Sequence, residues 1–303
     1  MDYNILQNND LKLSSIGLGT WVFDGGSWSG TQDHESLSAI HAAIDLGINL
    51  IDTAPIYGAG RSEKIVGVGI KGKRDKVVIA TKCGLLKKGN EVIHDLKPHT
   101  IVKEVQESLK RLQTDYIDIY QCHHPDPSTP LEDTLEQLVK LKDQGKIRYI
   151  GLSNYSIEDI KFASKYCQIV SLQHQYSLLN RDIESDILPF AKEKGIGVLT
   201  YGVLAGGILS GKYKEVPKFP NNDARKFFYP YYQEDKFLKI KDFMLNNNFN
   251  KPFNEVAINW VRSNNAVSSV LIGARNKTQV ESNVLALQWD LSEEDRGRLL
   301  FEF

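Results

Sequence analysis

The sequence predicts an α/β fold in which eight parallel strands close into a (β/α)8 TIM barrel, a single domain over residues 1–303. Three observations support this prediction. Short apolar runs alternate with longer segments whose apolar residues recur every three or four positions. Eight such units fit a chain of 303 residues, which is long enough for a closed barrel. No linker rich in proline, glycine or serine divides the chain, so we expect one domain.

The predicted strands are apolar along nearly their whole length, as expected when helices cover a sheet outside and side chains fill it inside. They occupy residues 16–20, 49–54, 77–84, 116–124, 148–154, 169–177, 196–204 and 267–275. Apolar stripes with helical spacing lie between them, at Ile101, Val105, Leu109 and Leu112, and at Leu135, Leu138 and Leu141.

Local signals mark the ends of several predicted helices. Ser156 and Ser292 each precede acidic residues, which is typical of a helix start. Gly47, Gly145 and Gly195 follow helical segments, where glycine commonly ends a helix. One long irregular stretch, 206–233, follows the seventh strand, and loops of this length are usually functional or mobile.

Composition and charge exclude several classes of protein. The net charge is −1 and no run of five like charges occurs, so neither nucleic acid nor a membrane surface is an expected partner. No signal peptide and no apolar run of membrane-spanning length is present. The three cysteines form no zinc-binding spacing and no disulfide framework. We therefore expect a cytoplasmic protein without a bound metal.

One glycine motif resembles a dinucleotide-binding loop. The segment GVGIKG, from Gly67 to Gly72, matches the pattern G-x-G-x-x-G. That motif binds phosphate only between a strand and the helix that follows it. Here the glycines lie at the end of a helical pattern, before the third predicted strand. We interpret them as close helix packing and a helix stop.

Polar side chains collect at the carboxyl ends of the predicted strands, where (β/α)8 barrels carry their working residues. They are Asp52, Tyr57, Lys82, His123, His124, Ser153, Asn154, Gln173, Tyr201 and Arg275. Taken singly, Asp52 is equally explained as a turn cap, and Tyr57 or His123 as a packed ring. Lys82 is harder to explain, because a buried ammonium needs an acidic partner, which Asp52 on the adjacent strand provides.

Four of these residues fit the chemistry of carbonyl reduction. The carbonyl oxygen gains negative charge and must receive a proton. A tyrosine such as Tyr57 serves as the acid if its pKa is brought down toward the working pH, and we expect the ammonium of Lys82 to lower it. Asp52 would fix the ammonium, and His123 would donate a hydrogen bond to the carbonyl oxygen.

At this point the chain resembles the aldo-keto reductases, over roughly residues 3 to 295. The motifs occur in order at the expected strand ends. They are IGLGTW (16–21), INLIDTAPIYGAGRSE (48–63), IATKCG (79–84), LKRLQTDYIDIYQCHHPD (109–126), GKIRYIGLSN (145–154), QYSLLNR (175–181) and IGARNKTQVESN (272–283). The resemblance is greatest to the bacterial oxidoreductase branch, which is also similar to the potassium-channel β subunits. It implies a nicotinamide cofactor and a catalytic tetrad of Asp52, Tyr57, Lys82 and His123.

The resemblance also implies which residues bind the cofactor. Ser153, Asn154 and Gln173 match residues that hold the nicotinamide carboxamide, and Tyr201 matches the aromatic that stacks on the ring. Arg225 matches a basic residue that reaches the phosphates, while Arg275 and Gln279 match the adenosine end. The remaining implied contacts are Gly19, Thr20, Trp21, Asp52, Gly202, Val203, Leu204, Gly206, Gly211, Lys212, Ile272, Gly273 and Asn283.

Two positions depart from the family pattern. His124 stands where tryptophan often follows the catalytic histidine. The implied substrate pocket consists of Trp21, Tyr57, His123 and His124, and these residues do not decide which carbonyl compound is the substrate. Gln279 stands where some branches carry arginine against the 2′-phosphate. We therefore expect Arg275 to bind the 2′-phosphate of NADPH by itself, with NADH as the less favoured cofactor. A slow, cofactor-sensing regulatory subunit is the alternative function. Monomer and homo-oligomer remain open.

Two cysteines adjoin predicted catalytic residues. Cys83 follows Lys82 and Cys122 precedes His123. Successive side chains of a strand point to opposite faces. We therefore expect both thiols to pack between barrel and helices, and not to act as nucleophiles.

Overall fold

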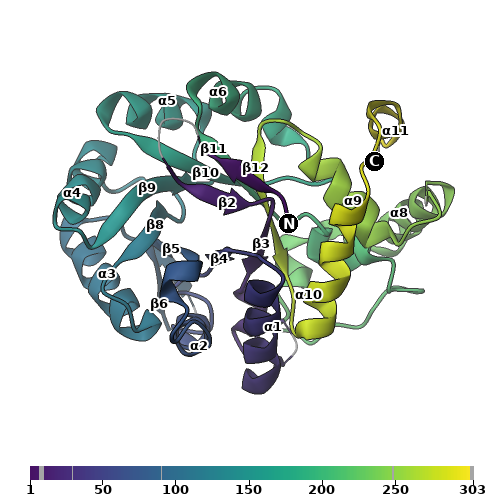
Figure 1. Cartoon of the computed structure of the whole chain (residues 1–303), viewed down its shortest axis with the longest axis horizontal. Coiled ribbons are helices and arrows are strands. Elements are labelled where there is room, and N and C mark those ends of the chain that lie inside the picture. The colour runs from purple at the N-terminus through teal and green to yellow at the C-terminus, as the bar shows by residue number, and fades with distance from the viewer. Residues whose placement is uncertain (7–9, 29, 90, 248, 301–303) are drawn as a thin grey trace.

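The computed structural model confirms the (β/α)8 barrel. Eight parallel strands close into a ring in the order β10-β11-β12-β3-β4-β5-β8-β9. Figure 1 shows the strands at the centre with helices around them. The structure describes residues 1–6, 10–28, 30–89, 91–247 and 249–300.

Each barrel strand lies within, or one residue from, a predicted run. The strands are β3 (Ile16–Gly19), β4 (Leu50–Asp52), β5 (Val78–Cys83), β8 (Ile117–Cys122), β9 (Ile147–Ser153), β10 (Ile169–Gln175), β11 (Gly197–Tyr201) and β12 (Val267–Gly273).

The helices lie between the strands and after the last of them, and most cover the outside of the barrel. They are α1 (Asp33–Asp45), α2 (Arg61–Gly69), α3 (Pro98–Leu112), α4 (Leu131–Asp143), α5 (Ile157–Tyr166), α6 (Ile187–Lys194), α7 (Arg225–Phe228), α8 (Glu234–Asn246), α9 (Phe253–Arg262), α10 (Lys277–Val284) and α11 (Glu293–Arg298). The predicted starts are confirmed, since the Ser156 and Ser292 side chains cap α5 and α11.

Short 3-10 helices occupy several of the connections. They are η1 (Trp21–Phe23), η2 (Arg74–Lys76), η3 (Asp182–Glu184), η4 (Ala205–Ser210), η5 (Pro230–Tyr232) and η6 (Leu285–Gln288). The stretch 206–233 is therefore less irregular than expected, because η4, α7 and η5 all lie in it.

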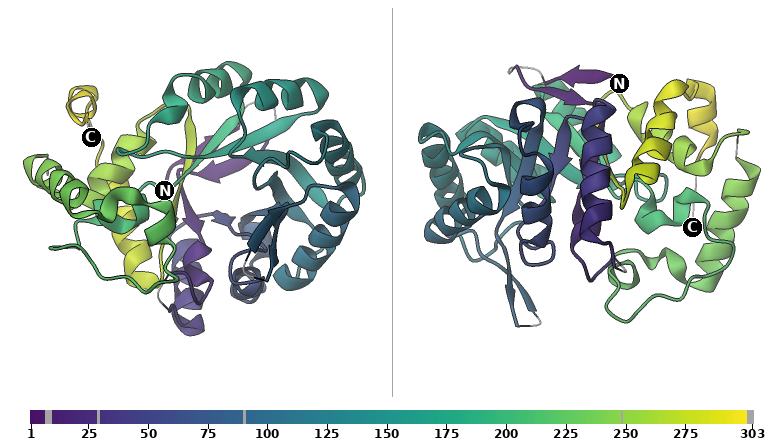
Figure 2. Two further views of the ribbon diagram at one scale, coloured as in Figure 1. Left: turned by 180° about the vertical axis from the view of Figure 1, so that it is seen from behind. Right: turned by 60° about the horizontal axis from the view of Figure 1, so that its bottom comes forward.

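Two antiparallel hairpins lie outside the predicted strands. β1 (Tyr3–Ile5) pairs with β2 (Lys12–Ser14), and β6 (Leu85–Lys88) pairs with β7 (Glu91–His94). In the right-hand view of Figure 2 the β1-β2 hairpin lies at one end of the barrel and the β6-β7 hairpin at the other. The second hairpin follows β5 directly, so it stands at the carboxyl end of the strands.

The barrel interior is apolar at one end and polar at the other. From the amino-terminal hairpin, Leu6, Leu11 and Leu13 pack against inward side chains of the strands. Those inward residues include Leu50, Ala80, Ile119, Leu199 and Leu271. Further along the same strands the inward side chains are polar. Because the hairpin and the apolar layer fill the amino-terminal end of the barrel, the polar carboxyl end is where a catalytic site can form.

Glycine makes room inside the narrow barrel. A Cβ on Gly17 would lie 2.7 Å from Leu271, and one on Gly151 would lie 2.4 Å from the Ser171 hydroxyl. Both distances are shorter than carbon contacts in packed interiors, so neither position accepts a side chain without displacing a neighbour.

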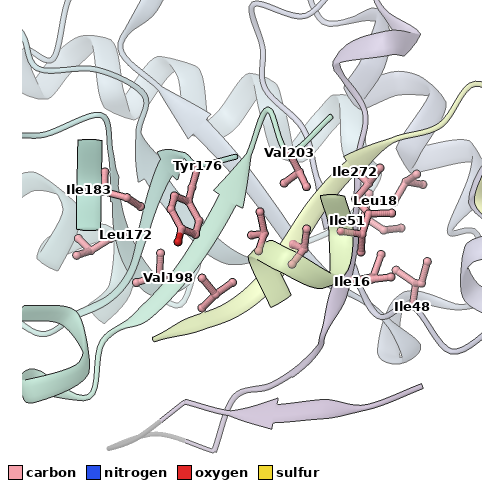
Figure 3. Packing of buried hydrophobic residues seen from close by; sticks show 14 of the residues in the cluster. Ile16, Leu18, Ile48, Ile51, Leu172, Tyr176, Ile183, Val198, Val203 and Ile272 are labelled. Carbon is pink, nitrogen blue, oxygen red and sulfur yellow. The ribbon is translucent and has the colours of Figure 1, made fainter. Parts of the chain in front are cut away.

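The main core lies between the barrel and the helices. Ile16, Leu18 and Ile51 point outward from β3 and β4 and pack in this layer, as Figure 3 shows. Cys83 and Cys122 belong to the same buried layer, which confirms that they face away from the barrel interior. The helical stripe predicted on α3 is likewise buried at Ile101, Val105 and Leu112.

Candidate active site

Four side chains meet at the carboxyl ends of β4, β5 and β8. Lys82 donates hydrogen bonds to Asp52 Oδ1 at 2.6 Å and to the Thr53 carbonyl at 2.9 Å. It also donates to the hydroxyl of Tyr57 at 3.3 Å. The Tyr57 ring lies edge-on to the His123 ring, with 5.9 Å between their centroids. The polar residues that the sequence placed on separate strands therefore form one cluster.

Tyr57 differs from the expectation drawn from the sequence. Burial, and second the negative charge of Asp52, raise the pKa of Tyr57 well above its usual value. The expectation that Lys82 would lower this pKa is therefore wrong for this structure. The reason is that Asp52 lies 2.6 Å from the ammonium, so the pair is close to neutral and burial dominates. Tyr57 consequently carries its proton at neutral pH.

His123 is a neutral imidazole. Burial, and second the positive charge of Lys82, hold the pKa of His123 well below its usual value. His124 stacks on it with 5.4 Å between ring centroids. Burial, and second the neighbouring His94, lower the pKa of His124 to about 4. Both rings are therefore uncharged at neutral pH and each has one N–H to donate.

Aromatic rings line the approach to this cluster. The Trp21 ring stacks on Tyr57, with 5.7 Å between centroids. Phe228, from α7, packs edge-on against Trp21 at 5.3 Å, and His94, from β7, lies 5.7 Å from His124. Sequence reasoning missed His94 because it lies in a connection whose path it did not predict.

The residues expected to hold the nicotinamide are continuous with the cluster. The Tyr201 hydroxyl donates to Asn154 Oδ1 at 2.8 Å. Asn154 Nδ2 donates to the Ser153 hydroxyl and to the His123 carbonyl, each at 3.0 Å. Asn154 adopts a left-handed backbone with φ 62°, which asparagine tolerates better than most residues. These contacts join β9 and β11 to the loop after β8.

Two glutamine amides complete the cluster from inside the barrel. Gln173 Nε2 donates to Asp52 Oδ2 at 2.7 Å, and Gln121 Nε2 donates to the same oxygen at 3.3 Å. Gln121 was not predicted as a site residue. Its signal in the sequence is its position two residues before His123, because alternate residues of a strand share a face.

The loop after β11 is tied down by aromatic residues. Gly206 has φ 71°, and a Cβ there would lie 2.8 Å from the Tyr229 ring. The Tyr232 hydroxyl donates to the Gly206 carbonyl at 3.0 Å. Five further residues predicted to contact the cofactor lie in this loop, namely Gly202, Val203, Leu204, Gly211 and Lys212.

Arg225 is buried in a polar cluster. Its Nε and Nη2 donate to the two carboxylate oxygens of Asp223 at 2.7 and 2.5 Å. Its guanidinium also lies 4.0 Å from the centroid of the Phe219 ring. This pair anchors α7, and the expected contact of Arg225 with phosphate stays a prediction.

Arg275 lies where α10 begins. The Asn276 side chain caps that helix, and the Arg275 N–H donates to Gln279 Oε1 at 2.9 Å. Arg275 Nη2 donates to the Trp28 carbonyl at 2.5 Å. Burial, and second the charge of Arg225, lower the pKa of Arg275 from its usual value. A second positive charge therefore acts on this end of the site.

The last predicted contacts lie on β3, β12 and α10. Gly19 pairs with both Asp52 and Gly273 across the barrel wall. The Thr20 hydroxyl donates to the Asp52 carbonyl at 2.8 Å. Ile272 and Asn283 are buried, on β12 and α10.

In the part of the chain that the structure describes, no helix is long and apolar enough to cross a membrane.

Comparison with known proteins gives first the class and then the family. The protein is an NAD(P)H-dependent oxidoreductase that reduces carbonyl compounds on a (β/α)8 barrel. The model of the aldo/keto reductase family matches residues 15–299, and the chain belongs to this family, in its bacterial branch.

Individual relatives match nearly the whole chain. It is 41% identical to aldo-keto reductase YhdN of Bacillus subtilis, over 98% of this chain and 92% of the relative. It is 36% identical to the NADH-specific methylglyoxal reductase of Escherichia coli, over 96% and 94%. The solved structure of glycerol dehydrogenase AKR11B4 from Gluconobacter oxydans superimposes with a TM-score of 0.89, at 38% identity, over 98% and 94%.

Proposed function

We propose that the protein reduces a small aldehyde or ketone with NADPH, and that Tyr57 is the general acid. The observation that carries this proposal is the 3.3 Å hydrogen bond from Lys82 Nζ to the Tyr57 hydroxyl. An ammonium has only hydrogens to donate, so the phenol oxygen accepts from it. The proton of the phenol is then left to point elsewhere, toward a carbonyl oxygen in the pocket.

The remaining members of the cluster support proton transfer from Tyr57. As negative charge appears on the phenol oxygen, the ammonium 3.3 Å away stabilises it. Asp52 holds the ammonium in place through its 2.6 Å contact. His123, neutral and edge-on to Tyr57, donates its N–H to the carbonyl oxygen and orients it.

The side chains at the ends of β9, β10 and β11 fit a nicotinamide cofactor. Its carboxamide needs both donors and acceptors, and Ser153, Asn154 and Gln173 offer both kinds of group side by side. Tyr201 adds an aromatic face. The bound cofactor supplies the hydride, and these residues would hold its ring beside the pocket.

Selection of NADPH over NADH rests on the basic end of the site. Arg275 stands at the N-terminus of α10, where backbone N–H groups favour an anion. Arg225 is the second cation here, since its charge acts on Arg275. The Escherichia coli relative is named as NADH-specific, so identity of 36% does not decide the preference. We assign the preference to Arg275 and the charge it carries.

The pocket favours a short carbonyl compound with polar groups. Its walls are the rings of Trp21, Tyr57, His123, His124 and Phe228. With the His123 N–H directed to the carbonyl oxygen, the His124 N–H is the donor for a second oxygen. Relatives named methylglyoxal reductase and glycerol dehydrogenase act on compounds of this size. Methylglyoxal and short hydroxyaldehydes are the first substrates to test.

The test compares Tyr57→Phe with the unmodified protein. We expect kcat to fall by about 10²–10⁴, because general-acid catalysis contributes that much. The dissociation constant for NADPH, measured by fluorescence titration, should stay within about threefold, since less than 0.7 kcal/mol of binding is then lost. Full activity in Tyr57→Phe would contradict the mechanism. Equal affinity for NADPH and NADH would contradict the assigned preference.

A further inference from the structure

Three polar side chains form a closed network below the proposed nicotinamide site. Asp52 Oδ2 accepts from Gln173 Nε2 at 2.7 Å and from Gln121 Nε2 at 3.3 Å. Gln173 Nε2 also lies 3.5 Å from Gln121 Oε1, to which it donates. All three side chains are buried, and Gln121 is completely so, with 0% exposure.

The orientation of both amides follows from hydrogen-bond chemistry. An ionised carboxylate only accepts hydrogen bonds, so each glutamine must present its NH2 group to Asp52. The second hydrogen of Gln173 Nε2 then points to Gln121 Oε1. Both hydrogens of Gln173 are used, and among the described residues none donates to Gln173 Oε1. That oxygen is the free acceptor of the network.

The fold reserves space for Gln121 in particular. Gly151 lies opposite it on β9, and a Cβ at Gly151 would be 2.9 Å from Gln121 Cγ. A buried amide lowers stability unless its donors and acceptors are paired. Within the described part of the chain, the side-chain amide of Gln121 is paired only through Asp52 and Gln173, both of which belong to the proposed site. Its place is therefore explained by what it does to those two residues.

We propose that Gln121 is a positioning residue that fixes the amide orientation of Gln173, so that Gln173 Oε1 accepts an N–H from the carboxamide of the nicotinamide cofactor. This inference rests on the proposed function. Without Gln121, the Gln173 amide keeps its 2.7 Å hydrogen bond to Asp52 but loses the acceptor for its second hydrogen, so the amide plane is free to tilt about that bond. Gln173 Oε1 is then no longer aimed at the carboxamide N–H.

The probe for this role is a pair of cofactors that differ in one group. In the 3-acetylpyridine analogue of NADP⁺ a methyl group replaces the carboxamide NH2, so this analogue has no N–H to give to Gln173. We expect the unmodified protein to bind NADP⁺ more tightly than the analogue by about tenfold, the value of one hydrogen bond. In Gln121→Met, which keeps length and loses the amide, we expect this ratio to fall to about one to threefold.

A third ligand separates positioning from general damage. Adenosine 2′,5′-bisphosphate lacks the nicotinamide, so its affinity should be the same in Gln121→Met as in the unmodified protein. Equal weakening of this fragment and of NADP⁺ would overturn the proposal, because it would mean a distorted site. An unchanged preference for NADP⁺ over the analogue would overturn it too. If the unmodified protein binds none of the three ligands, the proposed function itself fails.

Gln121→Glu provides a control that keeps the shape. Protonated, this carboxylic acid donates to Asp52 and accepts from Gln173, as the amide does. Ionised, it repels Asp52 and breaks the network. We expect NADP⁺ to bind normally at pH 6 and more weakly as pH rises to 9, with no such trend in the unmodified protein. An affinity that stays independent of pH would overturn the proposal even if Gln121→Met folds poorly.

Discussion

Lys82 and Asp52 form an ion pair at the carboxyl ends of adjacent strands, with 2.6 Å between Nζ and Oδ1 and side chains only 1% and 6% exposed. A buried pair contributes little net stability, but removing one partner leaves an unpaired charge in the interior. We expect Lys82→Met to lower the free energy of unfolding by about 3–5 kcal/mol, measured by chemical denaturation.

The matched control removes both charges. Asp52→Asn combined with Lys82→Met leaves no buried ion, so most of the lost stability should return. Carbonyl reduction should be lost in Lys82→Met and in the double variant alike, because the Tyr57 hydroxyl no longer has an ammonium 3.3 Å away. A double variant as unstable as Lys82→Met alone would show that packing, and not charge, makes the pair necessary.

Arg275 is expected to separate the two nicotinamide cofactors. Gln279 carries no charge, and Lys277, the first residue of α10, is exposed and paired with Glu281, so we expect the half-buried Arg275 to be the cation that meets the phosphate. Arg275→Ala should weaken NADPH by about ten- to a hundredfold, the range for a charge-assisted hydrogen bond to phosphate. NADH, which lacks the 2′-phosphate, should lose about threefold or less. Fluorescence titration of both cofactors measures this.

Arg275 also donates to the Trp28 carbonyl, so the variant could disturb the loop that carries Trp28. Gln279→Arg controls for this, since it keeps the Arg275 side chain and adds a charge in the first turn of α10, although it removes the Gln279 acceptor of the Arg275 backbone N–H. NADPH should bind more tightly to it, and NADH should not. Equal loss of both cofactors in Arg275→Ala would instead assign this residue to loop structure.

The barrel was predictable because its strands are marked by buried apolar residues along their whole length. The hairpins were not. Tyr3–Ile5 is exposed throughout, and no residue of Leu85–Lys88 or Glu91–His94 is buried. These three strands therefore lack the apolar buried residues that mark the barrel strands in the sequence. What fixes β1 and β2 is the closure of the barrel end by Leu6, Leu11 and Leu13, a tertiary contact.

Residues of the proposed site were predictable where a strand end places them. Asp52, Lys82 and His123 follow directly from strand position. The partners of Arg225 could not be predicted, because Asp223 and Phe219 reach it through a loop whose path depends on docking against the barrel mouth. The pKa of Tyr57 could not be predicted either, since it depends on how closely the Asp52 carboxylate approaches the Lys82 ammonium in the folded chain.

Gly67 provides a test of the glycine motif. A Cβ there would lie 2.6 Å from the Arg111 carbonyl of α3, so the glycine permits close packing of α2 against that helix. Gly67→Ala should destabilise the protein by about 1–3 kcal/mol through overpacking. The affinity for NADPH should not change, because the residues proposed to bind the phosphates lie elsewhere.

The matched control for Gly67→Ala is Gly297→Ala in α11, where no atom of the described residues outside that helix lies within 4 Å of the added carbon. There we expect a gain of up to about 1 kcal/mol from helix propensity. Chemical denaturation compares the two variants. Selective loss of NADPH affinity in Gly67→Ala, without loss of stability, would restore the phosphate-binding interpretation.

Glu104 is expected to make stability depend on pH. Its side chain is buried on α3, where Oε2 accepts the Gly84 N–H at 2.7 Å. Burial raises the pKa of Glu104 to about 8, even though the Gly84 hydrogen bond lowers it; Glu63 and Asp95 add to the rise and Arg111 opposes it.

The sign of this effect follows from proton binding in the two states. Between pH 4.5 and about 8 the unfolded chain releases the Glu104 proton while the folded chain keeps it, so the free energy of unfolding falls as pH rises through this window. Glu104→Gln removes the titration and keeps an oxygen for Gly84. Calorimetry should give equal melting temperatures near pH 5, with the variant several degrees more stable near pH 9, since each pKa unit corresponds to about 1.4 kcal/mol. A difference that stays constant from pH 5 to pH 9 would mean that Glu104 is ionised in the folded protein throughout, and that the Gly84 hydrogen bond outweighs burial.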